Sequence, residues 1–210
     1  MKTTILLYDR MTALDAVGPY EALSRLPGNE VLFVADRAGP VRTDTGFLSL
    51  VADASLDEAP EADIVLVPGG FAPPLRPGRV HEWLRAVDTT STWTTSVCVG
   101  SLILGAAGLL TGRKATSHWM TLDKLTAYGA VPTADRVVID GKYATAAGVS
   151  AGIDLALTLL AEIAGPEAAM AVQLGIEYDP APPFEAGSPA KAPAEIVGFL
   201  REHSDLVVRL

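Results

Sequence analysis

The chain contains one cysteine, Cys98, and it stands where an enzyme would place a nucleophile. A β-branched run over 92–97 predicts a buried strand before it, and the apolar run 100–110 predicts a helix after it. A sharp strand-to-helix turn with small residues two before and two after, here Ser96 and Gly100, is the pattern of a nucleophile elbow. We therefore predict a strained backbone at Cys98 and a thiol pKa lowered by nearby helix amides. The alternative is a small buried core residue.

Asp15 is the candidate partner of this cysteine. It follows the strand expected over 5–8 and opens the helix expected over 15–26. By itself, a carboxylate there is an N-cap or first-turn residue that stabilises the helix dipole. Beside Cys98, however, an ionised carboxyl would repel a thiolate, so the two groups would share one proton. Asp15 would then donate a proton to the reacting group and later take one back.

Three further positions are candidate substrate contacts. Gly69 and Gly70 follow the strand expected over 64–67, where they either end the strand or let the backbone approach a substrate. The Gly70 and Val99 amides would then form an oxyanion-type donor pair. His118 is a candidate polar neighbour, although a lone histidine is more often a core or surface residue.

The elements that position these residues alternate along the chain. Apolar strands are expected over 5–8, 31–35, 64–67 and 92–97, and helices over 15–26, 80–86, 100–110 and 151–163. A hairpin is expected over 41–51 and a strand pair over 137–145. This order predicts one α/β domain over residues 1–210, with a mostly parallel sheet covered by helices on both faces. In such sheets ligands bind beyond the carboxyl ends of the strands, where the loops holding Asp15, Gly69 and Cys98 converge.

Composition excludes several classes of function. The chain has 210 residues and a net charge of −9, which argues against a nucleic-acid partner. No apolar stretch approaches the ~18 residues of a membrane span, and no Cys/His cluster suggests a metal. We expect a cytoplasmic protein. Residues 94–112 carry no charged side chain, which favours a small, neutral, largely apolar substrate.

Several segments carry a family resemblance that spans nearly the whole chain in order. These segments are 12–21 (TALDAVGPYE), 67–70 (VPGG), 96–101 (SVCVGS), 106–110 (AAGLL), 115–119 (ATSHW), 147–154 (AGVSAGID) and 173–180 (QLGIEYDP). They resemble the DJ-1/PfpI superfamily and, within it, the isocyanide hydratases.

The resemblance implies a flavodoxin-like α/β sandwich that forms a homodimer, with Cys98 as nucleophile and Asp15 as its acid/base partner. It implies hydration of an isocyanide to an N-substituted formamide through a Cys98 thioimidate, without metal or organic cofactor. Isocyanide hydratases carry threonine directly after the cysteine, where this chain has Val99. Two alternatives stay open: a glyoxalase-like enzyme acting on a carbonyl, and a redox or stress sensor that works through oxidation of Cys98.

The C-terminal part of the chain adds an expectation about assembly. Residues 178–193 are rich in Pro, Ala and Gly and predict an extended loop, and a final amphipathic helix is expected over 195–202. The stretch 178–193 and the apolar helix over 151–163 offer more apolar surface than a monomer of this size readily hides. A homodimer with a two-fold axis is the commonest way to bury it.

Overall fold

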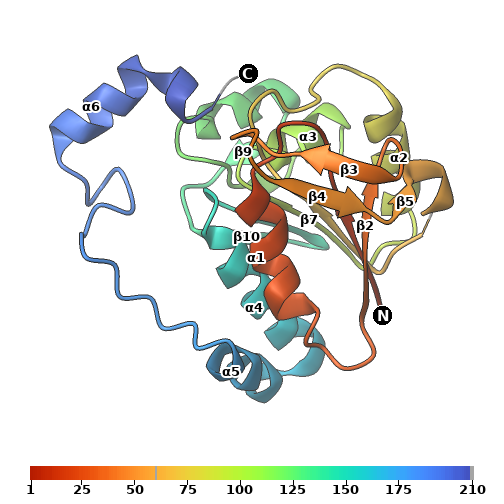
Figure 1. The fold of residues 1–210 in the computed structure, drawn as a ribbon. Coiled ribbons are helices and arrows are strands. Elements are labelled where there is room, and N and C mark those ends of the chain that lie inside the picture. Colours follow the sequence, from red (N-terminus) through yellow and green to blue (C-terminus); the bar gives the residue numbers. More distant parts are fainter. Residues whose placement is uncertain (60, 209–210) are drawn as a thin grey trace.

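A seven-stranded sheet forms the centre of the protein, as seen in a computed structural model that describes residues 1–59 and 61–208 (Figure 1). Neighbouring strands are parallel except β10, which runs antiparallel to β11 at one edge. In spatial order the strands are β10 (Val137–Asp140), β11 (Tyr143–Ala146), β7 (Trp93–Val97), β6 (Ile64–Val67), β1 (Lys2–Leu6), β2 (Glu30–Ala35) and β5 (Ala54–Ser55). The predicted flavodoxin-like sandwich, mostly parallel and covered on both faces, is confirmed.

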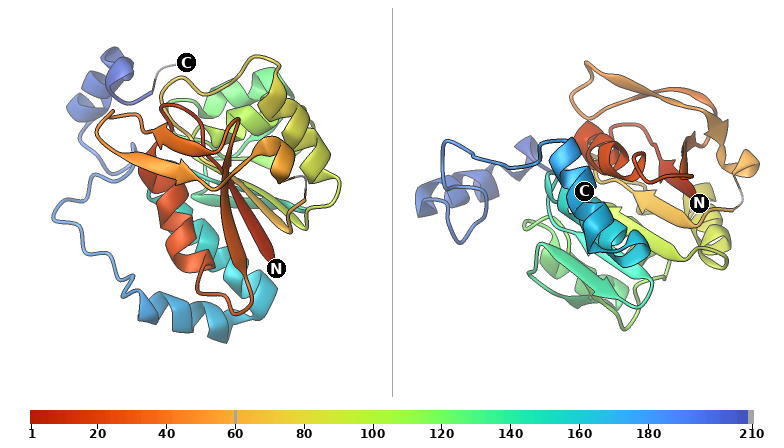
Figure 2. Two further views of the ribbon diagram at one scale, coloured as in Figure 1. Left: turned by 45° about the vertical axis from the view of Figure 1, so that its right-hand side comes forward. Right: turned by 90° about the horizontal axis from the view of Figure 1, so that it is seen from below.

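Helices cover the two faces of this sheet (Figure 2). One face carries α1 (Ala13–Leu23) and α4 (Ala151–Ala164), and the other carries α2 (Arg79–Asp88) and α3 (Gly100–Ala106). The strand β6 is buried along its whole length, as expected for a central parallel strand with helices on both sides. The predicted strand over 64–67 therefore coincides with the observed one.

Smaller elements complete the fold. The predicted hairpin is present as β3 (Gly39–Arg42) and β4 (Ser49–Ala52), which pair antiparallel. Several short elements were not predicted. They are the strand pair β8 (Lys114–Ala115) and β9 (Val131–Pro132) and the 3₁₀ segments η1 (Leu56–Glu58), η2 (Leu122–Tyr128) and η3 (Ser204–Leu206). They are too short to show a hydrophobic period, so their formation depends on tertiary contacts.

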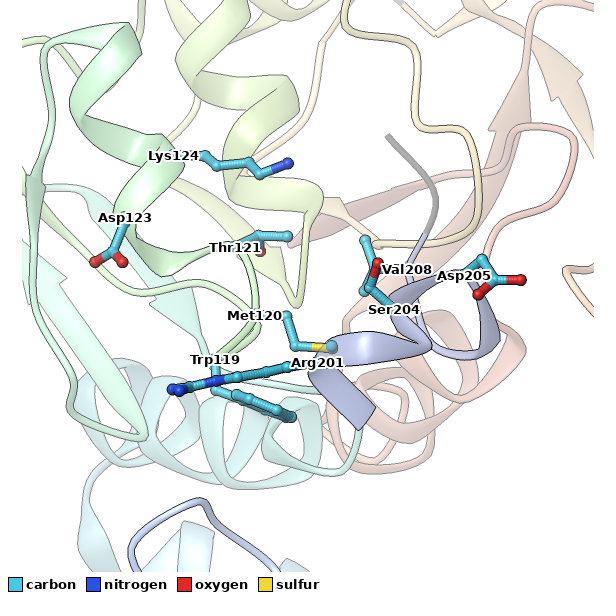
Figure 3. Close-up of a pocket in the computed structure, with 9 residues that line it drawn as sticks. All are labelled: Trp119, Met120, Thr121, Asp123, Lys124, Arg201, Ser204, Asp205 and Val208. Atoms are coloured by element: carbon cyan, nitrogen blue, oxygen red, sulfur yellow. The ribbon is translucent and has the colours of Figure 1, made fainter. Parts of the chain in front are cut away.

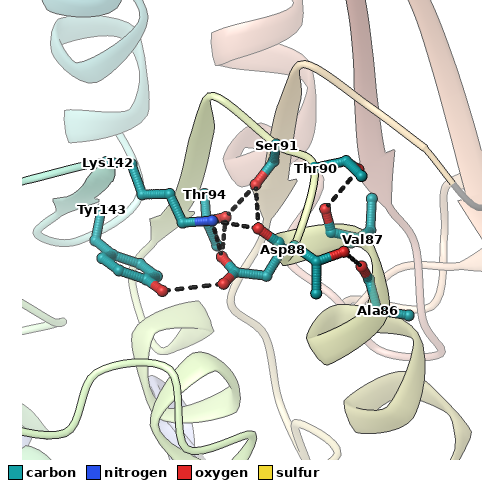
Figure 4. A network of polar contacts seen from close by, with 9 residues as sticks. Ala86, Val87, Asp88, Thr90, Ser91, Thr94, Lys142 and Tyr143 are labelled. Atoms are coloured by element: carbon teal, nitrogen blue, oxygen red, sulfur yellow. Dashed lines mark hydrogen bonds and ion pairs between the residues drawn. The ribbon is translucent and has the colours of Figure 1, made fainter.

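A buried polar network joins α2 to the amino ends of two central strands (Figure 4). The Asp88 carboxylate accepts hydrogen bonds from Thr94 Oγ1 at 2.6 Å and from Tyr143 Oη at 3.0 Å. Lys142 Nζ lies 3.1 Å from the same carboxylate. Thr94 belongs to β7 and Tyr143 to β11. The network therefore aligns, from the far end, the two strands whose carboxyl ends lead to Cys98 and to the loop at 147–150.

The predicted source of exposed apolar surface is partly wrong. The helix α4 packs against α1 and against α5 (Pro166–Gly175), so most of its apolar side chains are covered within the chain. The exposed apolar side chains lie further along instead, with Leu174 82% and Phe184 77% exposed. They belong to α5 and to the extended segment that arcs from α5 to α6 (Ala194–Glu202) in Figure 1. Among the described residues, no helix is long and apolar enough to cross a membrane.

Candidate active site

The elbow predicted at Cys98 is present. Cys98 lies between β7 and α3 with a backbone φ of +58°, a region that non-glycine residues rarely adopt. Its carbonyl accepts hydrogen bonds from the hydroxyls of Ser101 at 3.2 Å and Ser117 at 3.1 Å. Its amide donates to the Ala147 carbonyl at 2.9 Å. Paired backbone groups thus hold the strained residue in place, and 4% of Cys98 is exposed.

The small residue after the elbow has a steric cause. A Cβ atom at Gly100 would lie 2.2 Å from the Val67 carbonyl oxygen, closer than any real contact. Strand β6 and helix α3 therefore pass each other only because position 100 has no side chain. This close approach places Cys98 beside the loop that follows β6.

Asp15 lies fully buried in the first turn of α1. Its Oδ2 accepts a 2.8 Å hydrogen bond from the Gly69 amide, and its buried Oδ1 accepts none from any described residue. The N-cap position belongs to Thr12, whose hydroxyl donates to Asp44 Oδ2 at 2.6 Å. Asp15 is therefore bound across the site to the loop after β6, which the helix-cap alternative does not explain.

The two titratable groups act on each other. Burial raises the pKa of Asp15 to about 7, with the hydrogen bond from Gly69 lowering it and the charge of Asp44 raising it further. Burial, and then the Asp15 charge, raise the pKa of the Cys98 thiol above its ordinary value. The expected lowering of the thiol pKa by helix amides is therefore wrong for this structure. The Val149 and Val99 amides do favour the thiolate, but burial and Asp15 outweigh them. The pair holds at least one proton at neutral pH.

Of the three predicted backbone contacts, Gly69 and Gly70 join neighbouring segments of the site, and the Val99 amide contacts the thiol. The Gly69 amide is bound to Asp15, so in this structure it holds the carboxyl in place. A Cβ atom at Gly69 would lie 2.7 Å from the Val99 nitrogen and 2.8 Å from Cys98 Cβ. The Val99 amide faces the thiol, while the Val99 side chain is fully buried in the core. Gly70 pairs with Met11 in a one-residue antiparallel bridge that holds the Asp15 loop against the loop after β6.

Sequence reasoning missed two groups of this site. The Tyr8 hydroxyl donates to the Pro68 carbonyl at 3.1 Å, and burial with the charges of Asp15 and Cys98 raises the pKa of Tyr8 well above its usual value. Asp44 reaches the site from the hairpin between β3 and β4. The position of Tyr8 after β1, at the same edge of the sheet, was a signal that could have identified it. Asp44 carried no such signal, because the hairpin lies outside the sheet.

His118 lies near the site without joining the pair. Burial lowers the pKa of His118 to about 4, so its ring is neutral at physiological pH. A Cβ atom at Gly148 would lie 2.7 Å from its Cδ2, so the imidazole packs against that glycine. No hydrogen bond joins His118 to Cys98 or Asp15 in the described part of the chain. His118 lines the wall of the neighbouring cavity, as a polar neighbour of the site.

A cavity of ≈ 680 Å³ adjoins the elbow, which is in the range of small-molecule sites. It reaches the surroundings of Cys98 through Val149, whose amide interacts with the thiol, and through Ser117, which binds the Cys98 carbonyl. The extended C-terminal segment and α6 supply the outer wall. The described residues include no group of three His, Cys, Asp or Glu side chains arranged to hold a metal ion.

Comparisons with known proteins agree with this geometry. A family model described as the DJ-1/PfpI family matches residues 1–162. The isonitrile hydratase of Pseudomonas putida is 43% identical over 201 residues, covering 95% of this chain and 88% of that protein. The HTH-type transcriptional regulator CdhR of Pseudomonas aeruginosa is 37% identical over 144 residues, which cover 67% of this chain and 42% of the regulator.

Solved structures give the same assignment. The crystal structure of a ThiJ/PfpI family protein from Pseudomonas syringae superposes with a TM-score of 0.94 at 39% identity, covering 97% of this chain and 86% of that one. Drosophila melanogaster DJ-1beta, at 21% identity and a TM-score of 0.75, shares the fold. The strained cysteine elbow, the parallel sheet and these similarities lead to one conclusion: this chain belongs to the DJ-1/PfpI family.

Proposed function

We propose that this protein is an isocyanide hydratase, which adds water to an isocyanide to give an N-substituted formamide. The observation that carries the proposal is the pairing of a nearly buried thiol with a buried carboxyl whose pKa is raised to about 7. An isocyano group is a linear rod with its reactive carbon at the tip, so it can reach a sulfur that is only 4% exposed. The 43% identity to the isonitrile hydratase of Pseudomonas putida supports the same reaction.

The first step forms a carbon–sulfur bond. The Asp15 carboxylate takes the proton of the Cys98 thiol, and the thiolate attacks the terminal carbon of R–N≡C. Asp15 returns the same proton to that carbon, which gives the thioimidate R–N=CH–S–Cys98. The Val99 and Val149 amides face the sulfur and stabilise its charge during the attack.

The second step adds water and releases the enzyme. The oxygen of a water molecule adds to the thioimidate carbon while the Asp15 carboxylate removes a proton from that water. Asp15 then passes this proton to the substrate nitrogen. The carbon–sulfur bond then breaks, the sulfur leaves as thiolate, and the hydroxyl proton returns to it through Asp15. The products are R–NH–CHO and the free thiol, so no electron is gained or lost.

An assay with purified protein tests this function. Incubation with phenyl isocyanide should give N-phenylformamide in many turnovers per protein molecule, measured by liquid chromatography. Mass spectrometry of a quenched reaction should place the adduct on Cys98. Absence of formamide, combined with consumption of glyoxal, would instead identify the glyoxalase-like alternative.

We also infer a homodimer in the cytoplasm. Exposed apolar side chains on α5, the extended segment and α6, with Leu174 82% and Phe184 77% exposed, offer a surface that a second copy would cover. The reducing cytoplasm would preserve the single reactive thiol. Light scattering after size-exclusion chromatography should give twice the 21.9 kDa of one chain, and a mass near 21.9 kDa would contradict the dimer.

A further inference from the structure

The cavity beside the elbow carries a charge opposite to that of the whole protein. The chain has a net charge of −9. The lining of the ≈ 680 Å³ cavity nevertheless includes two arginines, Arg136 and Arg201, and neither Asp nor Glu among the described residues. An anionic group entering this cavity meets no like charge on its walls.

The two arginines differ in their partners. Arg136 is neutralised by Asp154, whose Oδ2 lies 2.6 Å from its Nη2. Arg201 has no ion-pair partner among the described residues, and its guanidinium lies over the ring of Trp119, 5.8 Å from the centroid. Figure 3 shows the Arg201 side chain lying along the Trp119 ring. An aromatic face leaves the N–H donors of Arg201 free for an incoming acceptor.

A second cavity is also lined by Arg201, but its lining carries charges of both signs. It has a volume of ≈ 710 Å³ and lies where η2 faces α6 and η3 (Figure 3). Its lining includes Asp123 and Asp205 as well as Lys124. The preference for an anion therefore belongs to the first cavity, whose lining includes Val149 and Ser117, two residues that contact Cys98.

We propose that the substrate is an isocyanide whose N-substituent fills the first cavity and ends in a carboxylate that pairs with Arg201. The inference rests on the proposed hydratase function. One unpaired guanidinium matches one monoanion, and its planar donors fit the two oxygens of a carboxylate. Trp119, which lines this cavity, would pack against the apolar part of the substituent, and the reacting carbon would meet Cys98, which lies in the uncharged stretch 94–112. The neutral character expected from the uncharged stretch 94–112 therefore applies only to the reacting end of the substrate.

Matched substrates test this inference. We expect kcat/KM for 4-isocyanobenzoate to exceed that for methyl 4-isocyanobenzoate by about tenfold, the scale of a charge-assisted hydrogen bond at a partly exposed site. The Arg201→Gln variant should lose this preference, so that the ratio of the two kcat/KM values falls to about one, and Arg201→Lys should keep part of it. The control Arg85→Gln removes an exposed arginine from α2, which contributes nothing to the cavity, and should behave as wild type. Equal rates with both substrates, or a preference that survives Arg201→Gln, would overturn the inference.

A binding measurement separates this inference from the reaction. Calorimetry with the product 4-formamidobenzoate and its methyl ester should show tighter binding of the carboxylate to wild type and no difference for Arg201→Gln. If isocyanides are not hydrated but this difference is present, the hydratase proposal fails and the anion site stands. If the ester is hydrated but the carboxylate gains neither rate nor affinity, the hydratase proposal stands and the carboxylate inference fails.

Discussion

The Gly69 amide donates a 2.8 Å hydrogen bond to Asp15 Oδ2, and this contact fixes the carboxyl beside Cys98. It joins the first turn of α1 to the loop after β6, two segments far apart in sequence. The same glycine has no room for a side chain, because a Cβ atom would lie 2.8 Å from both Asp15 Oδ2 and Cys98 Cβ. The relative placement of the Asp15 carboxyl and the Cys98 thiol therefore depends on one residue that lies against both.

The Gly69→Ala substitution tests this relationship. The added methyl group would push the carboxyl and the sulfur apart, so we expect formamide production to fall on the order of 10²-fold, the scale of a small misplacement of reacting groups. The control Gly198→Ala lies in α6, where a Cβ atom meets nothing within 4 Å, and should keep full activity. Steady-state rates of both variants, with circular dichroism to check folding, decide the question; full activity of Gly69→Ala would disprove the constraint.

Substitution of Cys98 tests covalent catalysis and backbone strain together. Cys98→Ala and Cys98→Gly should both abolish turnover, because each removes the sulfur. At a φ of +58° the Cβ atom is the source of strain, so alanine retains it and glycine relieves it. In urea denaturation, Cys98→Gly should be more stable than Cys98→Ala by about 1 kcal/mol. Equal stability would show that the surrounding structure absorbs the strain, and residual turnover would exclude the thioimidate.

Replacing Asp15 with asparagine should change activity and stability in opposite directions. Turnover should fall by about 10²–10⁴, the usual contribution of general acid–base catalysis. Because the pKa of Asp15 rises from 3.8 in the unfolded chain to about 7 when buried, its contribution to stability is lost as pH increases through that window. At pH 8 the Asp15→Asn variant should therefore be more stable than wild type by roughly 4 kcal/mol, and near pH 4 the difference should nearly vanish. A rate close to wild type would reduce Asp15 to a structural role.

Asp44 should set the pH at which the enzyme becomes active. Asp15 must be ionised to take the thiol proton, so kcat/KM should increase as pH passes through about 7. The Asp44 charge raises the pKa of Asp15, and Asp44→Asn should move this rise to lower pH. The asparagine oxygen still accepts the hydrogen bond from Thr12, which preserves the local structure. The control Asp36→Asn removes an equal charge from an exposed pair with Arg79 and should leave the profile in place. An unmoved profile for Asp44→Asn would exclude this electrostatic role.

His118 should affect acid stability more than catalysis. Its pKa is about 4 in the folded protein and 6.5 when unfolded, so the unfolded chain binds the extra proton first. Stability from the neutral ring is present above pH 6.5 and is lost as pH falls toward 4, by about 3 kcal/mol in total. The His118→Gln variant should lose less stability than wild type between pH 7.5 and 4.5 in urea denaturation. A loss of turnover on the scale of Asp15→Asn would instead make His118 a catalytic group.

The sequence by itself predicted the main strands and helices, and it singled out Cys98 and Asp15, which the structure brings together beside Gly69. Strand 64–67 and the turn at Cys98 were predictable because their signals are local: an apolar run, and small residues on both sides of a turn. The family was also predictable, since its motifs are short and contiguous. The hairpin over 41–51 was recognised for the same reason.

Only the tertiary structure determined how the pKa values of Cys98 and Asp15 are shifted and which residues surround the two side chains. The helix N-terminus predicted a lowered thiol pKa, but burial and the Asp15 charge raise it, and burial is a property of the assembled core. Asp44 and Gly69 contact the start of α1 from segments distant in the chain, and Arg201 lines the neighbouring cavity from α6. Electrostatic interactions act across space, whereas sequence patterns report neighbours along the chain. This is why Cys98 and Asp15 could be singled out from the sequence while the shifts of their pKa values could not.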